Sequence, residues 1–199
     1  MRHRPRQSLG QAMPAGITTL MLLFGLLCGA ITAQAADADT VNLGTGVPSA
    51  DEIQQGLFPD DECERLKASG FKCMGFKPPV RFSMPSTAFK VGSAELPEGI
   101  KRQLDAFAAV LKGKTGSGRT VRIEGHADAS GEPALNDALS QRRAEAARDY
   151  LVSKQVSPDL LKPVGLGSQA PVDPAQPLAP RNRRVVIARD QPPVSPASP

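Results

Sequence analysis

Side chains that carry enzymatic or metal chemistry are scarce in this sequence. Among 199 residues there are two histidines and three cysteines, and of the histidines only His126 lies beyond the first 35 residues. One imidazole with two distant thiolates is an incomplete ligand set for zinc, so we expect no metal site. The sequence holds no G-x-S-x-G nucleophile elbow, and no paired carboxylates suggest glycan hydrolysis. The sequence therefore argues against an enzyme and against a bound cofactor.

A catalytic triad can still be drawn by combining His126 and Asp128 with Ser130 or Ser140. However, His126 and Asp128 are two residues apart at the predicted end of a strand, which does not suit a triad. We expect His126 to be structural and hydrogen-bonded within its loop.

The basic character of the chain belongs mostly to its first residues. The first seven include three arginines, an apolar run follows at 17–31, and Ala33-Gln34-Ala35 closes it. These are the parts of a secretory signal peptide, so we expect residues 1–35 to be removed. The whole chain has a formal net charge of +4, but residues 36–199 hold 21 basic and 20 acidic residues. One excess positive charge does not support a nucleic-acid-binding surface.

Two other interpretations of this N-terminal segment stay open. Residues 17–33 reach the lower length limit of a membrane-spanning helix, so an uncleaved anchor is one alternative. Cys28 raises the alternative of a lipoprotein, but the preceding Gly25-Leu26-Leu27 does not match a lipoprotein signal. No other segment of the sequence is long and apolar enough to span a bilayer.

Residues 36–79 are predicted to form an N-terminal tether, and its first part, 36–59, is expected to be mostly disordered because it is polar and short of large apolar side chains. Ser49 followed by Glu52 fits a capping box at the start of one or two helical turns. Cys63 and Cys73 are an even number of cysteines in an exported chain, so we predict a disulfide between them.

A folded domain is predicted at residues 80–190, followed by a proline-rich disordered tail at 191–199. Because aromatic residues are few, Leu, Val, Ile and Ala must carry its packing. Two crossover helices on one small sheet predict a two-layer α/β sandwich. Strands are expected around 80–82, 88–91, 120–124, 162–165 and 184–188, and helices at 96–112 and 135–154. The apolar stripe assigned to the second helix is Leu135, Leu139, Ala146, Ala147, Tyr150 and Leu151.

The stretch from Gly125 to Leu151 reads as a strand end, a polar loop and a long helix, with Asp128 in the loop and Arg142-Arg143 on the helix. An acid and a base flanking one small pocket suit a zwitterionic ligand. Taken alone, Asp128 is better explained as a loop or helix cap, and the arginine pair is better explained as a solvated helix face. Periodicity does not choose between Arg142 and Arg143.

Several sequence blocks resemble the OmpA-like C-terminal domain, a peptidoglycan-binding module of Gram-negative envelope proteins. The resemblance spans roughly residues 80–190 and is specific because separate blocks occur at the family's intervals. It implies a β-α-β-α-β-β order, one small mixed sheet and two main helices on one face. The matching blocks are Gly125-His126-Ala127-Asp128, Gly131, Asn136, Leu139-Ser140, Arg143-Ala144 and Asn182-Arg183-Arg184-Val185.

The resemblance also implies a ligand, the diaminopimelate of the peptidoglycan stem peptide. Asp128 would pair with its ammonium and Arg143 with its carboxylate, while Ser130 and Asn136 would supply polar contacts and Arg183 would border the pocket. One position departs from the family pattern, since Ala127 stands where the family has threonine.

The sequence thus predicts a periplasmic, non-covalent peptidoglycan-binding protein that tethers or stabilises the cell envelope, in possible association with the outer membrane. A partner protein is expected only through residues 36–79. The alternative is an inner-membrane-anchored, stator-like or secretion-system component that uses the same domain with an uncleaved N-terminal helix.

Overall fold

The computed structural model describes residues 39–72, 78–85, 89–90 and 92–190. The predicted signal peptide and the predicted C-terminal tail lie outside the described residues. Within the described ranges, no helix combines the length and hydrophobicity that a membrane span requires.

A five-stranded mixed sheet forms the centre of the fold, in the order β1-β2-β5-β3-β4. The outer pairs β1–β2 and β3–β4 are parallel, whereas β5 runs antiparallel to both β2 and β3. The strands are β1 (Thr40–Asn42), β2 (Arg81–Pro85), β3 (Val121–His126), β4 (Leu161–Gly165) and β5 (Arg184–Arg189).

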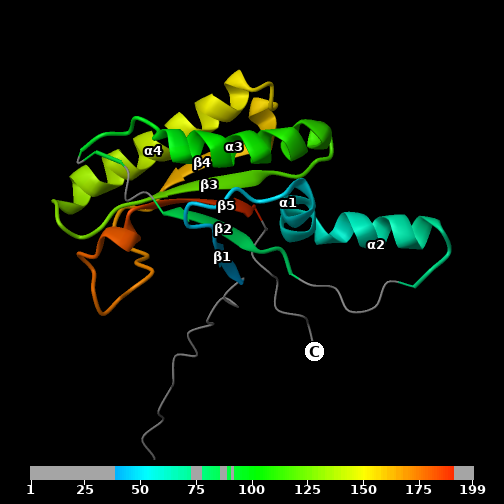
Figure 1. Cartoon of the computed structure of the whole chain (residues 1–199), viewed down its shortest axis with the longest axis horizontal. Coiled ribbons are helices and arrows are strands. Elements are labelled where there is room, and N and C mark those ends of the chain that lie inside the picture. The colour runs from blue at the N-terminus through cyan, green and yellow to red at the C-terminus, as the bar shows by residue number, and fades with distance from the viewer. Residues whose placement is uncertain (1–38, 73–77, 86–88, 91, 191–199) are drawn as a thin grey trace, which may run out of the picture. The chain divides into compact units, whose positions relative to one another are not determined.

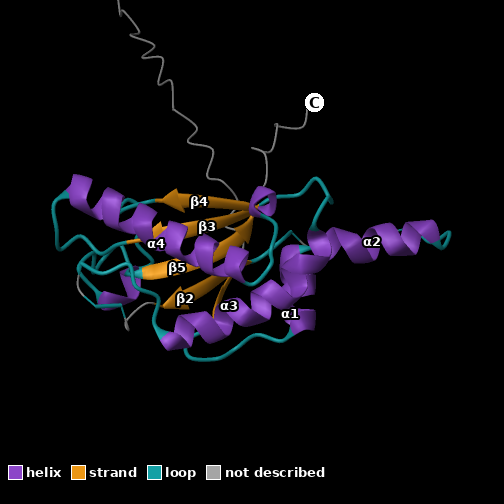
Figure 2. Cartoon of the chain, turned by 90° about the horizontal axis from the view of Figure 1, so that it is seen from above, coloured by secondary structure: helices purple, strands orange, loops and turns teal. Residues whose placement is uncertain are grey.

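Helices α3 (Glu98–Leu111) and α4 (Pro133–Ser153) lie side by side on one face of the sheet (Figures 1 and 2). From β2 onward the order is β-α-β-α-β-β, so the predicted two-layer α/β architecture is confirmed. Three short 3-10 helices complete these connections: η1 (Lys112–Lys114), η2 (Pro158–Leu160) and η3 (Pro180–Asn182).

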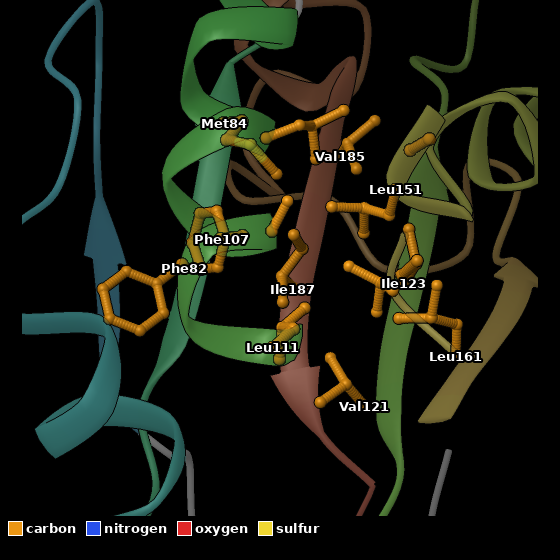
Figure 3. Packing of buried hydrophobic residues seen from close by; sticks show 14 of the residues in the cluster. Phe82, Met84, Phe107, Leu111, Val121, Ile123, Leu151, Leu161, Val185 and Ile187 are labelled. Carbon is orange, nitrogen blue, oxygen red and sulfur yellow. The ribbon is translucent and has the colours of Figure 1, made fainter. Parts of the chain in front are cut away.

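The core lies between the sheet and the helices (Figure 3). The ring of Phe107 on α3 meets the ring of Phe82 on β2 edge to face, with centroids 5.3 Å apart. All four apolar positions predicted for the first helix are buried, because its i, i+4, i+7 spacing places them on one face. They are Ile100, Leu104, Phe107 and Leu111.

The stripe predicted for the second helix is partly wrong. Leu135 is 67% exposed, whereas small and polar side chains occupy the inward face of the first half of α4. The buried side chains of α4 are Asn136, Ser140, Arg143, Ala144, Ala147 and Leu151. The largest apolar residues therefore do not mark the buried face, since this half of the helix serves a polar site rather than the core.

The strand predicted around 80–82 corresponds to β2, which covers Arg81–Pro85. The strand predicted at 88–91 is wrong where the structure describes it, since Phe89 and Lys90 lie outside any strand. The other two residues of that expected strand, 88 and 91, are outside the described residues. Phe89 is nonetheless buried, because its ring packs against an arginine of the site described below.

The described part of the predicted tether is folded, which corrects the prediction of mostly disordered chain. β1 pairs with β2 at the sheet edge, and α1 (Ala50–Leu57) packs against α3. Ile53, Leu57 and Phe58 are at most 1% exposed and belong to the core. The predicted capping box is confirmed, since Ser49 and Glu52 exchange hydrogen bonds at the start of α1.

Helix α2 (Pro59–Ala68) has no buried residue and is held to the domain by ion pairs instead. Its first turn faces Arg119, whose guanidinium contacts Asp60 at 3.0 Å and also pairs with Asp61. Cys63 lies on this helix and is disulfide-bonded. Its predicted partner Cys73 is outside the described residues, so the Cys63–Cys73 pairing stays a prediction.

Candidate functional site

Close backbone contact between β3 and α4 positions the candidate site. A Cβ atom at Gly125, on β3, would overlap the backbone carbonyl of Ser140 on α4. Ser140 is fully buried, and its hydroxyl accepts a hydrogen bond from the backbone N–H of Gly167 at 2.8 Å. The glycine therefore lets the polar face of α4 lie directly against the strand that leads into the Asp128 loop.

Gly125→Ala is expected to lower the free energy of unfolding by about 1–3 kcal/mol, because the added methyl must push α4 away from β3. Chemical denaturation measures this change. Gly113→Ala is the matched control, since a Cβ there meets no atom within 4 Å. Equal stability of the two variants would contradict the close-packing argument.

Asp128 lies in the loop between β3 and α4 and is 6% exposed. One carboxylate oxygen accepts hydrogen bonds from the backbone N–H of Ser130, at 3.1 Å, and from its hydroxyl. The other accepts from Nη1 of Arg183 at 2.5 Å. Burial alone would raise the pKa of this carboxyl, but the bonds from Ser130 and Arg183 outweigh it and lower the pKa. Asp128 is therefore an ionised group with both oxygens engaged.

Asn136, in the first turn of α4, fixes the loop that carries Asp128. Its Nδ2 donates to the backbone carbonyls of Asp128 and Gly131, both at 3.1 Å. Asn136 is only 7% exposed, so it supports the site by fixing the backbone of this loop. Ser130 is exposed, so it lies at the solvent side of the loop.

The structure separates the two arginines that periodicity left equivalent. Arg142 is exposed, whereas Arg143 is 1% exposed. Nε of Arg143 donates to the carbonyl of Ser93 at 3.0 Å, and its guanidinium carbon lies 4.6 Å from the centre of the Phe89 ring. Burial lowers the pKa of Arg143, as do the nearby charges of Arg183 and Arg142, while Asp128 acts in the opposite direction.

One nitrogen of Arg143 is unsatisfied. Nη1 is buried and has no hydrogen-bond partner in the part of the chain that the structure describes. No carboxylate of the described residues lies within ion-pair distance of this guanidinium, which is unusual for a buried arginine. The guanidinium of Arg143 can therefore donate hydrogen bonds to a carboxylate from outside the chain.

Arg183 enters the site from the start of β5. The preceding Asn182 is fully buried, and its amide donates to the carbonyls of Gln176 and Pro177. This anchor fixes the backbone, while the Arg183 side chain keeps 25% exposure and reaches Asp128. Arg184 points elsewhere and donates to the carbonyls of Asn182 and Ala170.

His126 does not face the site. It lies on β3, is 1% exposed, and its Nε2 is 3.3 Å from a carboxylate oxygen of Glu124. Its hydrogen bond therefore lies within the strand. The prediction that His126 would be hydrogen-bonded within its loop is wrong. Burial lowers the pKa of His126. Among the described residues, no group of three or more His, Cys, Asp or Glu is placed to hold a metal ion.

Position 127 departs from the family pattern without disturbing the loop. Ala127 is 4% exposed, and its N–H donates to the carbonyl of Gly167 at 2.7 Å. The sequence interpretation missed Phe89, Ser93 and Ser140 as supports of the site. One signal could have identified Ser140, because Asn136, Ser140 and Arg143 share the inward face of one helix.

Comparison with known proteins places these residues in a family. The sequence profile of the OmpA family matches residues 88–184. Over 84 residues the chain is 43% identical to the peptidoglycan-associated lipoprotein of Pseudomonas aeruginosa, covering 42% of this chain and 48% of that protein. Over 94 residues it is 43% identical to outer membrane protein A of Yersinia pseudotuberculosis, covering 46% of this chain and 26% of that protein.

Among solved structures, the peptidoglycan-associated lipoprotein from Burkholderia pseudomallei is 30% identical, with 51% of this chain and 86% of that chain covered and a TM-score of 0.45. The chain spans about half or less of the length of the two curated relatives named above. Through the domain that contains Asp128, Asn136 and Arg143, the chain belongs to the OmpA family.

Proposed function

We propose that this chain is a non-covalent peptidoglycan-binding protein of the cell envelope, and that its OmpA-family domain binds the diaminopimelate of the stem peptide. The observation that carries the proposal is the buried Arg143, which has an unpartnered nitrogen and lies within the electrostatic influence of Asp128. The names of the related lipoproteins, which describe them as peptidoglycan-associated, support the same ligand class.

The proposed chemistry is that of a zwitterion. The free end of diaminopimelate carries an ammonium and a carboxylate. The planar guanidinium of Arg143 matches a carboxylate, and such charge-assisted hydrogen bonds are among the stronger polar contacts. Asp128 is the acidic group for the ammonium. The Asp128 carboxylate is contacted by Ser130 and Arg183, and the backbone carbonyl of Asp128 is held by Asn136.

We propose binding without catalysis. The hydroxyl of Ser130 donates to Asp128 and that of Ser140 donates to the carbonyl of Asp137. In the described residues neither hydroxyl is hydrogen-bonded to His126, whose imidazole contacts Glu124. A serine nucleophile activated by histidine is therefore not supported.

An exported protein follows from the same proposal. We infer periplasmic localisation with association to peptidoglycan or the outer membrane, removal of residues 1–35, and a Cys63–Cys73 disulfide. Mass spectrometry of the mature protein checks these points together. Ala36 as the first residue and one intact disulfide are expected, whereas a retained Met1 or two free thiols would contradict them.

Sedimentation with purified sacculi tests the binding site. Arg143→Ala is expected to reduce retention at least about tenfold, since it removes a charge-assisted contact to the ligand, and Asp128→Ala is expected to reduce retention by a smaller factor, because Arg183 already pairs with Asp128. The controls are Asp159→Ala and Arg142→Ala, which change exposed residues of the same types. Circular dichroism shows which variants are folded. Folded Asp128 and Arg143 variants that sediment like the parent would refute the site.

A further inference from the structure

The two charged poles of the proposed site are not equally available. Both oxygens of Asp128 are engaged, one by Ser130 and the other by Arg183. A ligand ammonium must therefore share this carboxylate with Arg183 or displace it. Displacing a paired guanidinium cancels much of what the new ion pair contributes.

Arg143 is in the opposite situation. It is 1% exposed, and its polar contacts are a backbone carbonyl and an aromatic face. These contacts leave one donor without a hydrogen bond, because Nη1 has no partner among the described residues. They also leave the positive charge unpaired, because a carbonyl and an aromatic ring carry no net charge. A ligand carboxylate that binds here pairs with a desolvated cation and displaces no acidic group of the described residues.

The charge count leads to the same conclusion. Asp128 contributes one negative charge, and Arg143 and Arg183 contribute one positive charge each, so the site has an excess of one positive charge. Such a site favours an anionic group over a cationic one at the point of entry.

We propose that recognition is led by the ligand's carboxylate, and that Arg183 sets specificity by occupying Asp128 in competition with the ligand's ammonium. This inference rests on the proposed function and refines it. Arg143 is the contact that decides affinity. The ammonium contributes a smaller increment, equal to the difference between its bond to Asp128 and the bond that Arg183 gives up.

The position of Arg183 allows this exchange. Its backbone follows Asn182, whose side chain is held by the carbonyls of Gln176 and Pro177 and accepts from the N–H of Asp173. The Arg183 side chain is 25% exposed, so its guanidinium can move to solvent or to the ligand carboxylate while its backbone stays fixed.

A matched set of synthetic tripeptides tests the inference. Each is L-alanyl-γ-D-glutamyl-X, where X is meso-diaminopimelate, aminopimelate without the distal ammonium, or lysine without the distal carboxylate. Calorimetry with the parent protein is expected to place aminopimelate within about tenfold of diaminopimelate, and lysine roughly a hundredfold weaker, because lysine leaves Arg143 buried without a counter-ion.

Variants at Arg183 test the competition. Arg183→Gln removes the competing cation, so the preference for diaminopimelate over aminopimelate is expected to widen by roughly tenfold. Arg183→Lys keeps a cation and should restore a preference close to that of the parent. Arg181→Gln is the matched control, because that side chain is 52% exposed and pairs with Asp173 instead.

The outcomes separate this inference from the function on which it rests. Binding of the lysine peptide as tight as that of the aminopimelate peptide would overturn carboxylate-led recognition. An unchanged preference in folded Arg183→Gln protein would overturn the competition. Parent protein that sediments with sacculi but distinguishes none of the peptides would refute the inference and diaminopimelate recognition, and would leave peptidoglycan binding standing. Failure to sediment would refute both.

Discussion

Arg143→Met is expected to abolish retention on sacculi and, at the same time, to raise the free energy of unfolding by about 1–2 kcal/mol. A buried charge without a counter-ion destabilises a fold, because desolvation of the guanidinium is not offset by an ion pair. Arg143 is such a charge among the described residues, since its contacts are the Ser93 carbonyl and the Phe89 ring. Replacing it with an apolar side chain removes the desolvation cost.

Methionine suits this position for three reasons. It is long and flexible enough to fill much of the space that arginine leaves. Its sulfur also makes favourable contacts with aromatic rings, here that of Phe89. The Ser93 carbonyl, which loses a hydrogen bond, belongs to a residue of intermediate exposure and can be solvated instead.

Denaturant unfolding and sacculus sedimentation on the same protein give both measurements. Arg142→Met is the control, because this neighbouring arginine is exposed, and it is expected to leave stability within about 0.5 kcal/mol of the parent. A folded Arg143→Met protein that is less stable than the parent by more than about 1 kcal/mol would show that the buried guanidinium is satisfied by its surroundings.

The same arginine shows where sequence patterns stop being informative. The α3 pattern predicted its four buried apolar positions, because that face of the helix meets only apolar core. On α4 the inward face begins with Asn136, Ser140 and Arg143, so the usual rule that apolar residues face inward points to the wrong side. The resemblance selected Arg143 over Arg142 because it uses spacing within a motif rather than hydrophobicity.

The folded N-terminal segment was missed for a different physical reason. Residues 39–58 hold few large apolar side chains, and composition therefore suggested disorder. In the structure Ile53, Leu57 and Phe58 are almost completely buried. Gln103 on α3 also donates to two carbonyls of the loop before α1, at 3.1 and 2.7 Å. These contacts join residues far apart in sequence, and no local pattern encodes them.

Glu124→Gln is expected to be the most destabilising charge-removing substitution on the helix-free face of the sheet, with a loss of about 3 kcal/mol near neutral pH. Glu124 lies on β3 and is fully buried. Arg81 from β2 and Arg122 from β3 both pair with its carboxylate, and His126 is hydrogen-bonded to it. Arg184 on β5 also acts on it electrostatically. Without the carboxylate, these cations face one another with no acidic group between them.

The same carboxylate makes the fold sensitive to acid. Burial alone would raise the pKa of Glu124, but His126, Arg81 and Arg122 outweigh it and lower the pKa from 4.5 to about 2. Because the unfolded chain binds this proton first, the stabilisation is complete above about pH 4.5 and is lost as the pH falls toward about 2, a total of about 3 kcal/mol. His126 acts in the same direction. Burial lowers its pKa below 6.5, so the unfolded state is protonated before the folded one as the pH falls.

Urea unfolding of the parent and of Glu124→Gln between about pH 7 and pH 2.5 tests both statements. The difference in stability between the two proteins is expected to be largest near neutral pH. It should shrink below about pH 4, where the contribution of the ionised Glu124 to the parent's free energy of unfolding falls. Asp159→Asn, an exposed acid on η2, controls for general acid destabilisation and should follow the parent at every pH. A constant difference across the range would mean that the charge of Glu124 does not stabilise the sheet, because a contribution from its charge must titrate.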